Sequence, residues 1–380
     1  MNVLLYVLGA ILVVGGLVDV FLTVLHYDAP GLVLARSYRF VWHIARTATA
    51  ALPERPRSLA RSMVAPVMVA GSIGGWLGAQ LLGFGLIFLP GFQSRHGFTL
   101  GQLTGSLWSA LYFSAATLTS LSFSDVEPRT LGYHWLAAAE TLIGLGILTL
   151  TISYLLGLYQ VLRQQSVLAA RIQHQSGSSN DPRSLLAPHF FNGQARETSV
   201  LVRDLHQGLT EHYQGLLRYP IVYYFHTRQP NRSIAYIFWF VGATAAALRW
   251  GLPEGHPVAA DPWLPALIEG YEDMARHLED RFLPDAPEAP PEPVPFDTFL
   301  LARATGMDPE NERLKSFLAI DRCLQDLACL KEPSDAHEAY QRYQQWFHFT
   351  SCGRAFVQSA TQDLGLSPQV LYEEPGRSLF

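Results

Sequence analysis

The chain has 380 residues and a formal net charge of −5 at pH 7, a length that allows two or three domains. Its basic residues are almost all arginine and are spread along the chain, which excludes the concentrated basic face that nucleic-acid binding requires. The cysteines match no zinc or redox spacing, so we expect reduced thiols at Cys323, Cys329 and Cys352.

Three long stretches in the first part of the chain are nearly free of charge. Residues 3–25 carry only Asp19, residues 63–89 carry none, and residues 133–162 carry only Glu140. A bilayer core about 30 Å thick requires about 20 apolar residues in a helix. Each stretch therefore predicts a transmembrane helix. The first lacks the basic start and cleavage site of a secretory signal, so we expect it to be retained.

The arginines in the connecting loops predict the orientation. The loop between the first two spans contains six arginines, whereas residues 90–132 contain only Arg95 and Arg129. Arginine-rich loops stay in the cytoplasm. We therefore expect a multi-pass protein of a bacterial inner (plasma) membrane, with the N-terminus and the 90–132 loop outside and the C-terminal part in the cytoplasm. The six arginines are Arg36, Arg39, Arg46, Arg55, Arg57 and Arg61.

The outer loop contains a second apolar run, residues 103–118, which is too short to cross the bilayer. Non-helical backbone at membrane depth is tolerated only inside protein or beside a water-filled cavity. The run therefore predicts a re-entrant helix between two spans, which is the arrangement of a pore-loop channel.

Residues 110–125, ALYFSAATLTSLSFSD, resemble the pore helix and filter of the bacterial potassium-channel-like family, whose filter ends T-V-G-Y-G-D. The resemblance covers about residues 63–162. It aligns Thr117–Leu118–Thr119 with the lead into the filter and Asp125 with the closing acid. Pro128, Ala139, Glu140 and Gly144 also fit the family pattern. The ion-filter residues that it implies are Thr119, Ser120, Leu121, Ser122, Phe123, Ser124 and Asp125.

The resemblance implies a pore-loop tetrameric channel domain. With the first apolar stretch and the soluble remainder of the chain, we expect an all-α membrane protein that has an extra N-terminal transmembrane helix and a helical cytosolic C-terminal domain. It implies a homotetramer in a lipid bilayer, no cofactor, and permeant monovalent cations, potassium or sodium or both. A cytosolic ligand is left open as a partner.

The filter departs from the family pattern at two glycines and a tyrosine. Ser122 and Ser124 replace the glycines whose positive φ lets successive carbonyls point at the ion, and Phe123 replaces the tyrosine. We expect a wider, less selective cation filter, lined by serine hydroxyls with Thr119 at its inner end. Asp125 and Glu127 would form negative rings at the outer mouth, which Arg129 would weaken. A potassium-selective pore, a tension-opened pore and a non-conducting scaffold or sensor are the alternatives.

The last predicted span carries further candidate residues. Glu140 is predicted to support the filter from behind, or to reach towards the outer interface. A gate could hinge at Gly144 and Gly146, and Thr149 and Ser153 share a face that could line the cavity. Close packing by small residues is the alternative for this group.

The rest of the chain predicts helical cytosolic subdomains. The turn at residues 176–182 precedes a helical region, 183–284, in which residues 234–248 form a buried helix rather than a span. A proline-rich break at 284–296 separates a last helical unit. The predicted division is 1–62 (first span and arginine-rich linker), 63–165 (pore domain), 183–284, and 297–380.

No signature of catalysis or nucleotide binding occurs in the chain. It contains no dinucleotide fingerprint, P-loop, zinc spacing or nucleophile elbow, so we expect no enzyme. His206 and His212 do not share one helical face as a ligand pair would, and they are interpreted as surface histidines. The aromatic run at residues 219–226 is interpreted as packing.

Overall fold

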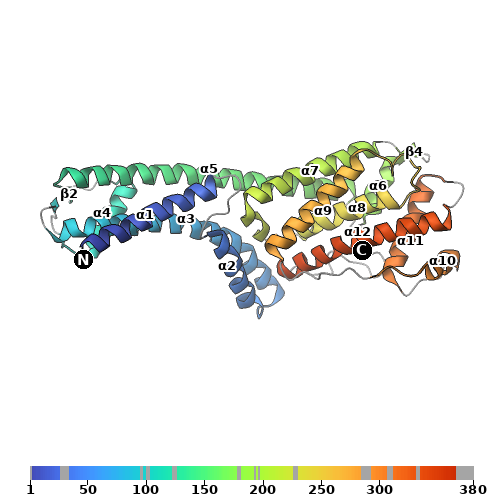
Figure 1. The fold of residues 1–380 in the computed structure, drawn as a ribbon, viewed down its shortest axis with the longest axis horizontal. Coiled ribbons are helices and arrows are strands. Elements are labelled where there is room, and N and C mark those ends of the chain that lie inside the picture. The colour runs from blue at the N-terminus through green and yellow to red at the C-terminus, as the bar shows by residue number, and fades with distance from the viewer. Residues whose placement is uncertain are drawn as a thin grey trace. The chain divides into compact units, whose positions relative to one another are not determined.

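The computed structural model describes residues 2–25, 34–94, 97–99, 103–121, 126–177, 181–191, 194–195, 197–225, 230–283, 292–305, 311–330 and 334–364. The regular elements of these residues are helices apart from two pairs of two-residue strands (Figure 1), which confirms the all-α fold class. The chain divides into two compact units. The first contains Met1–Gln160 and Leu217–Phe225, and the second contains Val161–Leu216 and His226–Phe380.

Three helices of the first unit match the three apolar stretches: α1 (Asn2–Val24), α3 (Glu54–Gln93) and α5 (Leu131–Gln175). All three are long and apolar enough to cross a membrane, which confirms the predicted spans. Both α3 and α5 extend beyond those spans, chiefly at residues 54–62 and 163–175, where more polar, helix-compatible sequence continues the helix. α5 supplies residues to both units, since the division falls after Gln160.

Helices α1 and α3 pack closely through a pair of glycines. A Cβ built on Gly9 would lie 2.5 Å from the Gly83 carbonyl oxygen, and one built on Gly83 would lie 2.9 Å from the Gly9 carbonyl oxygen. Small residues of this kind let membrane helices approach to backbone contact. Farther along, Trp76 Nε1 donates to the buried carboxylate of Asp19 at 2.8 Å. The extra N-terminal helix is therefore joined to α3 by packing and by a buried hydrogen bond.

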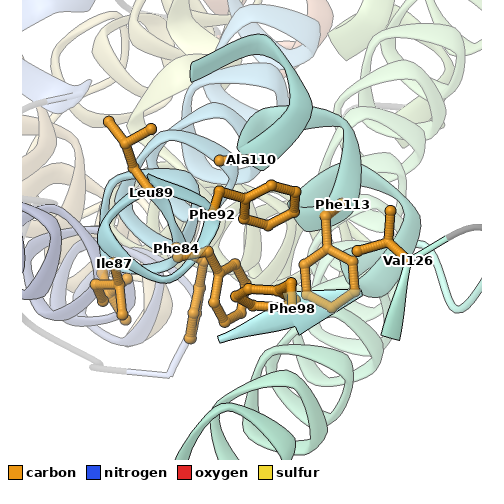
Figure 2. Close-up of a cluster of buried hydrophobic side chains, with 10 residues drawn as sticks. Phe84, Ile87, Leu89, Phe92, Phe98, Ala110, Phe113 and Val126 are labelled. Atoms are coloured by element: carbon orange, nitrogen blue, oxygen red, sulfur yellow. The ribbon is translucent and has the colours of Figure 1, made fainter. Parts of the chain in front are cut away.

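A cluster of aromatic side chains holds the short helix α4 (Leu107–Leu118) against α3. Figure 2 shows Phe92, Phe98 and Phe113 facing one another between the two helices and strand β1 (Phe98–Thr99). The ring centroids of Phe92 and Phe98 lie 4.4 Å apart, and those of Phe98 and Phe113 lie 5.0 Å apart. Aromatic pairs at such distances add to the stabilisation from burial. The helix that precedes the candidate filter is thus packed against α3 by this aromatic cluster.

Helix α2 (Leu34–Thr49) lies between the first span and α3 in the chain, and its described residues bury one face more than the other. Tyr38 and Trp42, one turn apart, are buried, and the Tyr38 hydroxyl lies 2.9 Å from Ser72 Oγ on α3. Phe40 and Ile44, on another face, are 67% and 48% exposed in the chain.

The second unit is built around α8 (Ile234–Trp250), in which every residue except Arg249 is buried. The Ser233 side chain caps it by accepting from Tyr236 N. α6 (Pro182–Leu186), α9 (Trp263–Phe282), α11 (Glu312–Leu327) and α12 (Ala336–Leu364) contact α8. The predicted buried helix at 234–248 is confirmed. The other elements described in this unit are α7 (Thr198–Arg218), α10 (Phe296–Thr305), the 3-10 helices η1 (Ala187–His189) and η3 (Pro230–Arg232), and the strand pair β3 (Phe190–Phe191) and β4 (Gln194–Ala195).

His212 is not a surface histidine, which corrects the interpretation from the sequence. Its side chain is fully buried on α7, and neither ring nitrogen has a hydrogen-bond partner among the described residues. It shares its face with the buried leucines Leu205, Leu209 and Leu216. Burial lowers the pKa of His212 to about 4, because the imidazolium would lose its hydration.

We predict that acid destabilises the second unit through His212. The unfolded histidine has a pKa near 6.5, so stability is full above about pH 6.5 and falls as the pH is lowered towards 4. The linkage relation gives a loss of about 2 kcal/mol at pH 5. Melting temperatures of the purified full-length protein between pH 7.5 and 5 measure it.

His212→Leu should flatten this pH dependence, whereas His348→Leu, at an exposed position of the same unit, should retain it. An unchanged slope in His212→Leu would contradict the assignment.

The sequence-based division of the soluble part into 183–284 and 297–380 stays a prediction. In the structure, α8 of the first segment and α11 and α12 of the second contact one another within one compact unit.

Candidate functional site

The candidate site is built on α4, which enters the fold and stops after 12 residues. At 1.5 Å per residue it is about 18 Å long, too short to cross a bilayer. Ser106 begins the helix, since its hydroxyl accepts from Ser109 N. One face is buried, including Ala110, Phe113 and Ser114. The described part of the loop therefore has the length and burial expected of a re-entrant helix.

The C-terminal end of α4 turns sharply at Ser120, which has a φ of 58°. Ser120 N donates to the Thr117 carbonyl at 3.0 Å, and Leu121 N donates to the Ala116 carbonyl at 2.8 Å. These two bonds form a Schellman motif, whose left-handed position glycine normally occupies. A side chain there costs about 1 to 2 kcal/mol. The serine thus occupies a strained position directly at the start of the candidate filter.

Two short strands close the base of the loop. β1 pairs antiparallel with β2 (Glu127–Pro128), so that Phe98 faces Pro128 and Thr99 faces Glu127. Arg129 continues the pairing, because its backbone N–H donates to the Gly97 carbonyl at 2.8 Å and its Nε donates to Thr99 Oγ1 at 3.1 Å. The two ends of the loop that contains α4 and the filter region therefore lie side by side.

Helix α5 holds α4 from behind at three successive levels. Ser114 Oγ on α4 lies 2.5 Å from Glu140 Oε1 on α5. Thr141 Oγ1 lies 3.2 Å from the Thr117 carbonyl oxygen and 3.1 Å from that of Ala137 in its own helix. One turn on, a Cβ on Gly144 would overlap the carbonyl oxygen of Leu118. Gly144 thus permits the close approach of α5 to the last residue of α4.

The opposite face of α5 is open in the single chain. Gly146, Thr149 and Ser153 lie on it, and a Cβ at Gly146 would meet nothing within 4 Å. The two hydroxyls donate to carbonyls of their own helix, those of Leu145 and Thr149. Large apolar side chains share this face: Leu142, Leu145, Ile152 and Leu156. The four predicted hinge and cavity residues are therefore separated, with Gly144 packed and the other three exposed.

Of the predicted filter residues, Thr119, Ser120 and Leu121 are all exposed in the chain. The Thr119 hydroxyl donates to the Ala115 carbonyl at 2.7 Å. Ser122, Phe123, Ser124 and Asp125 lie outside the described residues. Glu140 is fully buried, and its Oε2 has no hydrogen-bond partner in the described part of the chain.

Sequence reasoning missed Ser114 and Thr141. A helical projection of α4 places Ser114 one turn before Leu118, on the face that meets α5, and this signal could have paired it with the acid in the next span. Among the described residues, no group of three or more histidine, cysteine or acidic side chains is arranged to hold a metal ion.

The comparisons with known proteins agree with this geometry. Residues 81–160 match the model of a family described as "Ion channel". The chain is also similar to Protein LctB of Geobacillus stearothermophilus, with 37% identity over 76 residues that cover 18% of this chain. The chain spans about half of that relative, 56% of its length. No solved structure gives a significant match.

The matched segment runs from α3 through α4 and the filter region to the end of the first unit's part of α5. It contains the short helix, its aromatic base and the contacts of Glu140, Thr141 and Gly144. Residues 81–160 are therefore similar to an ion-channel family, in a chain with three described helices that are long and apolar enough to cross a membrane.

Proposed function

We propose that the chain forms a homotetrameric cation channel of the inner membrane, in which four copies of α4 surround a water-filled axis. The observation that carries the proposal is the short helix α4, buried on one side against α3 and α5 and ending in the exposed residues Thr119, Ser120 and Leu121. Exposed polar backbone at membrane depth requires a protein or water neighbour. Symmetry-related copies around a pore would supply both.

The open face of α5 supports an assembly of several copies. In the apolar window of this helix only 28% of residues are buried within one chain. Some of the exposed residues would face lipid, but Thr149, Ser153 and Gly146 give the face a small and polar stripe that suits contact with other copies or a cavity. The tetramer and the roles of these residues are part of the proposal.

The filter would be weakly selective. Ser120 shows that this turn accepts a serine at positive φ, at a cost of about 1 to 2 kcal/mol. Serines at the two family glycine positions, Ser122 and Ser124, would repeat that cost in every subunit if the usual carbonyl cage formed. A filter lined partly by hydroxyls avoids the cost and is wider. Asp125 and Glu127 at the outer mouth would favour cations, potassium and sodium alike.

Glu140 would support the filter from behind in its protonated form. Ser114 Oγ lies 2.5 Å from Glu140 Oε1 and also 3.0 Å from the Leu81 carbonyl oxygen. The hydroxyl has one hydrogen and cannot donate fully to both acceptors. If the carboxyl group donates to Ser114, the serine donates to Leu81 and both contacts are made. A neutral acid also avoids an unpaired charge inside the first unit, which contains the predicted spans and is called the membrane unit below.

The topology would place the N-terminus outside and the second unit in the cytoplasm, because the α1–α3 connection contains the arginine-rich loop. The second unit would then act on the pore from the cytoplasmic side.

The test is ion flux through the full-length protein in liposomes and planar bilayers, with protein-free liposomes as the control. With potassium on one side and sodium on the other, the reversal potential should indicate a permeability ratio below about tenfold. Ser122→Gly combined with Ser124→Gly should raise the potassium preference. Native mass measurement in detergent should give four chains.

Three results would contradict the proposal. Strong potassium preference in the unaltered protein would show that serine replaces glycine without loss of the cage. A complete lack of flux from well-folded protein would favour a scaffold or sensor. If the protein is monomeric both in detergent and in the membrane, there is no symmetry axis for a pore.

A further inference from the structure

The segment Leu217–Phe225 belongs to the first unit, although the residues on both sides of it belong to the second. The chain leaves the second unit after Leu216, contributes these nine residues to the membrane unit, and returns at His226. We call Leu217–Phe225 the inserted segment. Together with α5, it gives three covalent connections between the units. Both ends of the inserted segment are therefore covalently continuous with the second unit.

The inserted segment is bound firmly in the first unit. Its middle forms a short 3-10 helix, η2 (Pro220–Tyr224), that contacts α2 and α3. Ile221, Val222, Tyr223 and Tyr224 are each at most 4% exposed. The ring of Tyr224 lies 5.6 Å from that of Trp42 on α2. Burial of this size makes the segment part of the membrane unit's core rather than a loose linker.

Tyr219 connects the inserted segment to α5, the helix that would line the pore. Its ring centroid lies 5.5 Å from that of Tyr154. A Cβ built on Gly157 would overlap the Tyr219 hydroxyl oxygen and lie 2.7 Å from the ring carbon that carries it. Only glycine at position 157 leaves room for this contact. Gly157 lies 13 residues after Gly144, about 20 Å farther along the helix, towards its cytoplasmic end.

A buried polar connection continues from this contact. Tyr154 lies near Tyr38 on α2, whose hydroxyl lies 2.9 Å from Ser72 Oγ on α3. The inner part of α5 is thus linked to the inserted segment by Tyr219, to α2 by Tyr38, and through Ser72 to α3.

We propose that Tyr219 is a positioning residue for the gate: its seat against Gly157 sets where the cytoplasmic end of α5 lies, and the inserted segment transmits movement of the second unit to it. This inference rests on the proposed channel function. The proposal requires that the contact between Tyr219 and Gly157 change when the pore opens or closes. The proposal gives a regulatory role to residues 217–225, which lie outside the segment 81–160 that resembles an ion channel.

Single-channel recording of the full-length protein in planar bilayers tests it. Gly157→Ala and Tyr219→Ala should each change the open probability at least threefold, in the same direction, because both remove the same contact. The double variant should resemble Tyr219→Ala alone, since the added methyl group then meets no ring. Unitary conductance and reversal potential should stay unchanged, because the filter is not touched.

Gly132→Ala is the matched control, because it lies on the same helix and its Cβ would meet nothing within 4 Å. It should leave the open probability unchanged. Tyr219→Phe, which removes only the hydroxyl, serves if Gly157→Ala does not fold, and should shift the open probability in the same direction by more than twofold but less than Tyr219→Ala does.

The outcomes separate the two proposals. If the unaltered protein conducts and the variants keep its open probability within twofold, or if only the conductance changes, Tyr219 does not position the gate and the channel function stands. If the unaltered protein carries no current under any condition, the channel function falls and this inference falls with it.

Discussion

Replacing Gly144 by alanine is expected to displace the pore helix and to reduce ion flux at least tenfold. The new Cβ would overlap the carbonyl oxygen of Leu118 and lie 3.1 Å from its carbonyl carbon, at the last residue of α4. Backbone atoms cannot rotate away as a side chain can, so α4 or α5 must shift. Overpacking of this kind costs about 1 to 3 kcal/mol. Melting temperature and liposome flux of the purified full-length variant measure the two effects.

Gly146→Ala provides the contrast, because its Cβ would enter open space on the other face of the same helix. Alanine is favoured over glycine inside a helix by about 1 kcal/mol, so the melting temperature should rise. If Gly144 mattered only as a hinge, both substitutions would stabilise the helix alike. Equal, positive shifts in melting temperature would therefore contradict the packing role of Gly144.

The membrane helices and the re-entrant helix could be predicted from the sequence because their signal is local. An apolar run of more than 20 residues requires a span, and the 103–118 run is too short for one. The lengths of α1, α3, α5 and α4 follow directly from these limits. The buried helix α8 followed in the same way, because the apolar run 234–248 lies between Arg232 and Arg249 and is too short to cross a bilayer.

The contacts between distant segments could not be predicted in this way. The aromatic run at 219–226 indicated packing, but nothing in its composition specified that it joins the membrane unit and meets Gly157. The partner of Glu140 depends on how α4 and α5 are rotated about their axes, which apolar length does not fix. The burial of His212 could have been predicted, because its spacing from Leu205, Leu209 and Leu216 is that of one helical face. The adjacent acids Asp204 and Glu211 instead favoured the interpretation as a polar surface.

Removing the charge of Arg342 is expected to destabilise the second unit by about 3 to 5 kcal/mol, the cost of leaving a buried partner charge uncompensated. The Arg342 side chain is 1% exposed, and its NH2 donates to Asp321 Oδ1 at 2.9 Å. NH2 also donates to Ser334 Oγ at 2.8 Å, and NH1 donates to the Trp250 carbonyl at 2.7 Å. One guanidinium thus joins α12 to α11 and to the end of α8. Arg342→Met would leave the Asp321 carboxylate buried without its cation.

The double variant Arg342→Met with Asp321→Leu separates the pair's net contribution from the cost of the orphaned charge. Replacing a whole buried ion pair by apolar residues is often neutral, so the double variant should recover most of the lost stability. The Trp250 carbonyl loses its donor in both variants, and this limits the recovery by about 1 kcal/mol. Chemical denaturation of the full-length protein in detergent gives the free energies. If the double variant is as unstable as Arg342→Met, the arginine stabilises the second unit through its contacts with Trp250 and Ser334. The unpaired Asp321 carboxylate would then contribute little to the destabilisation.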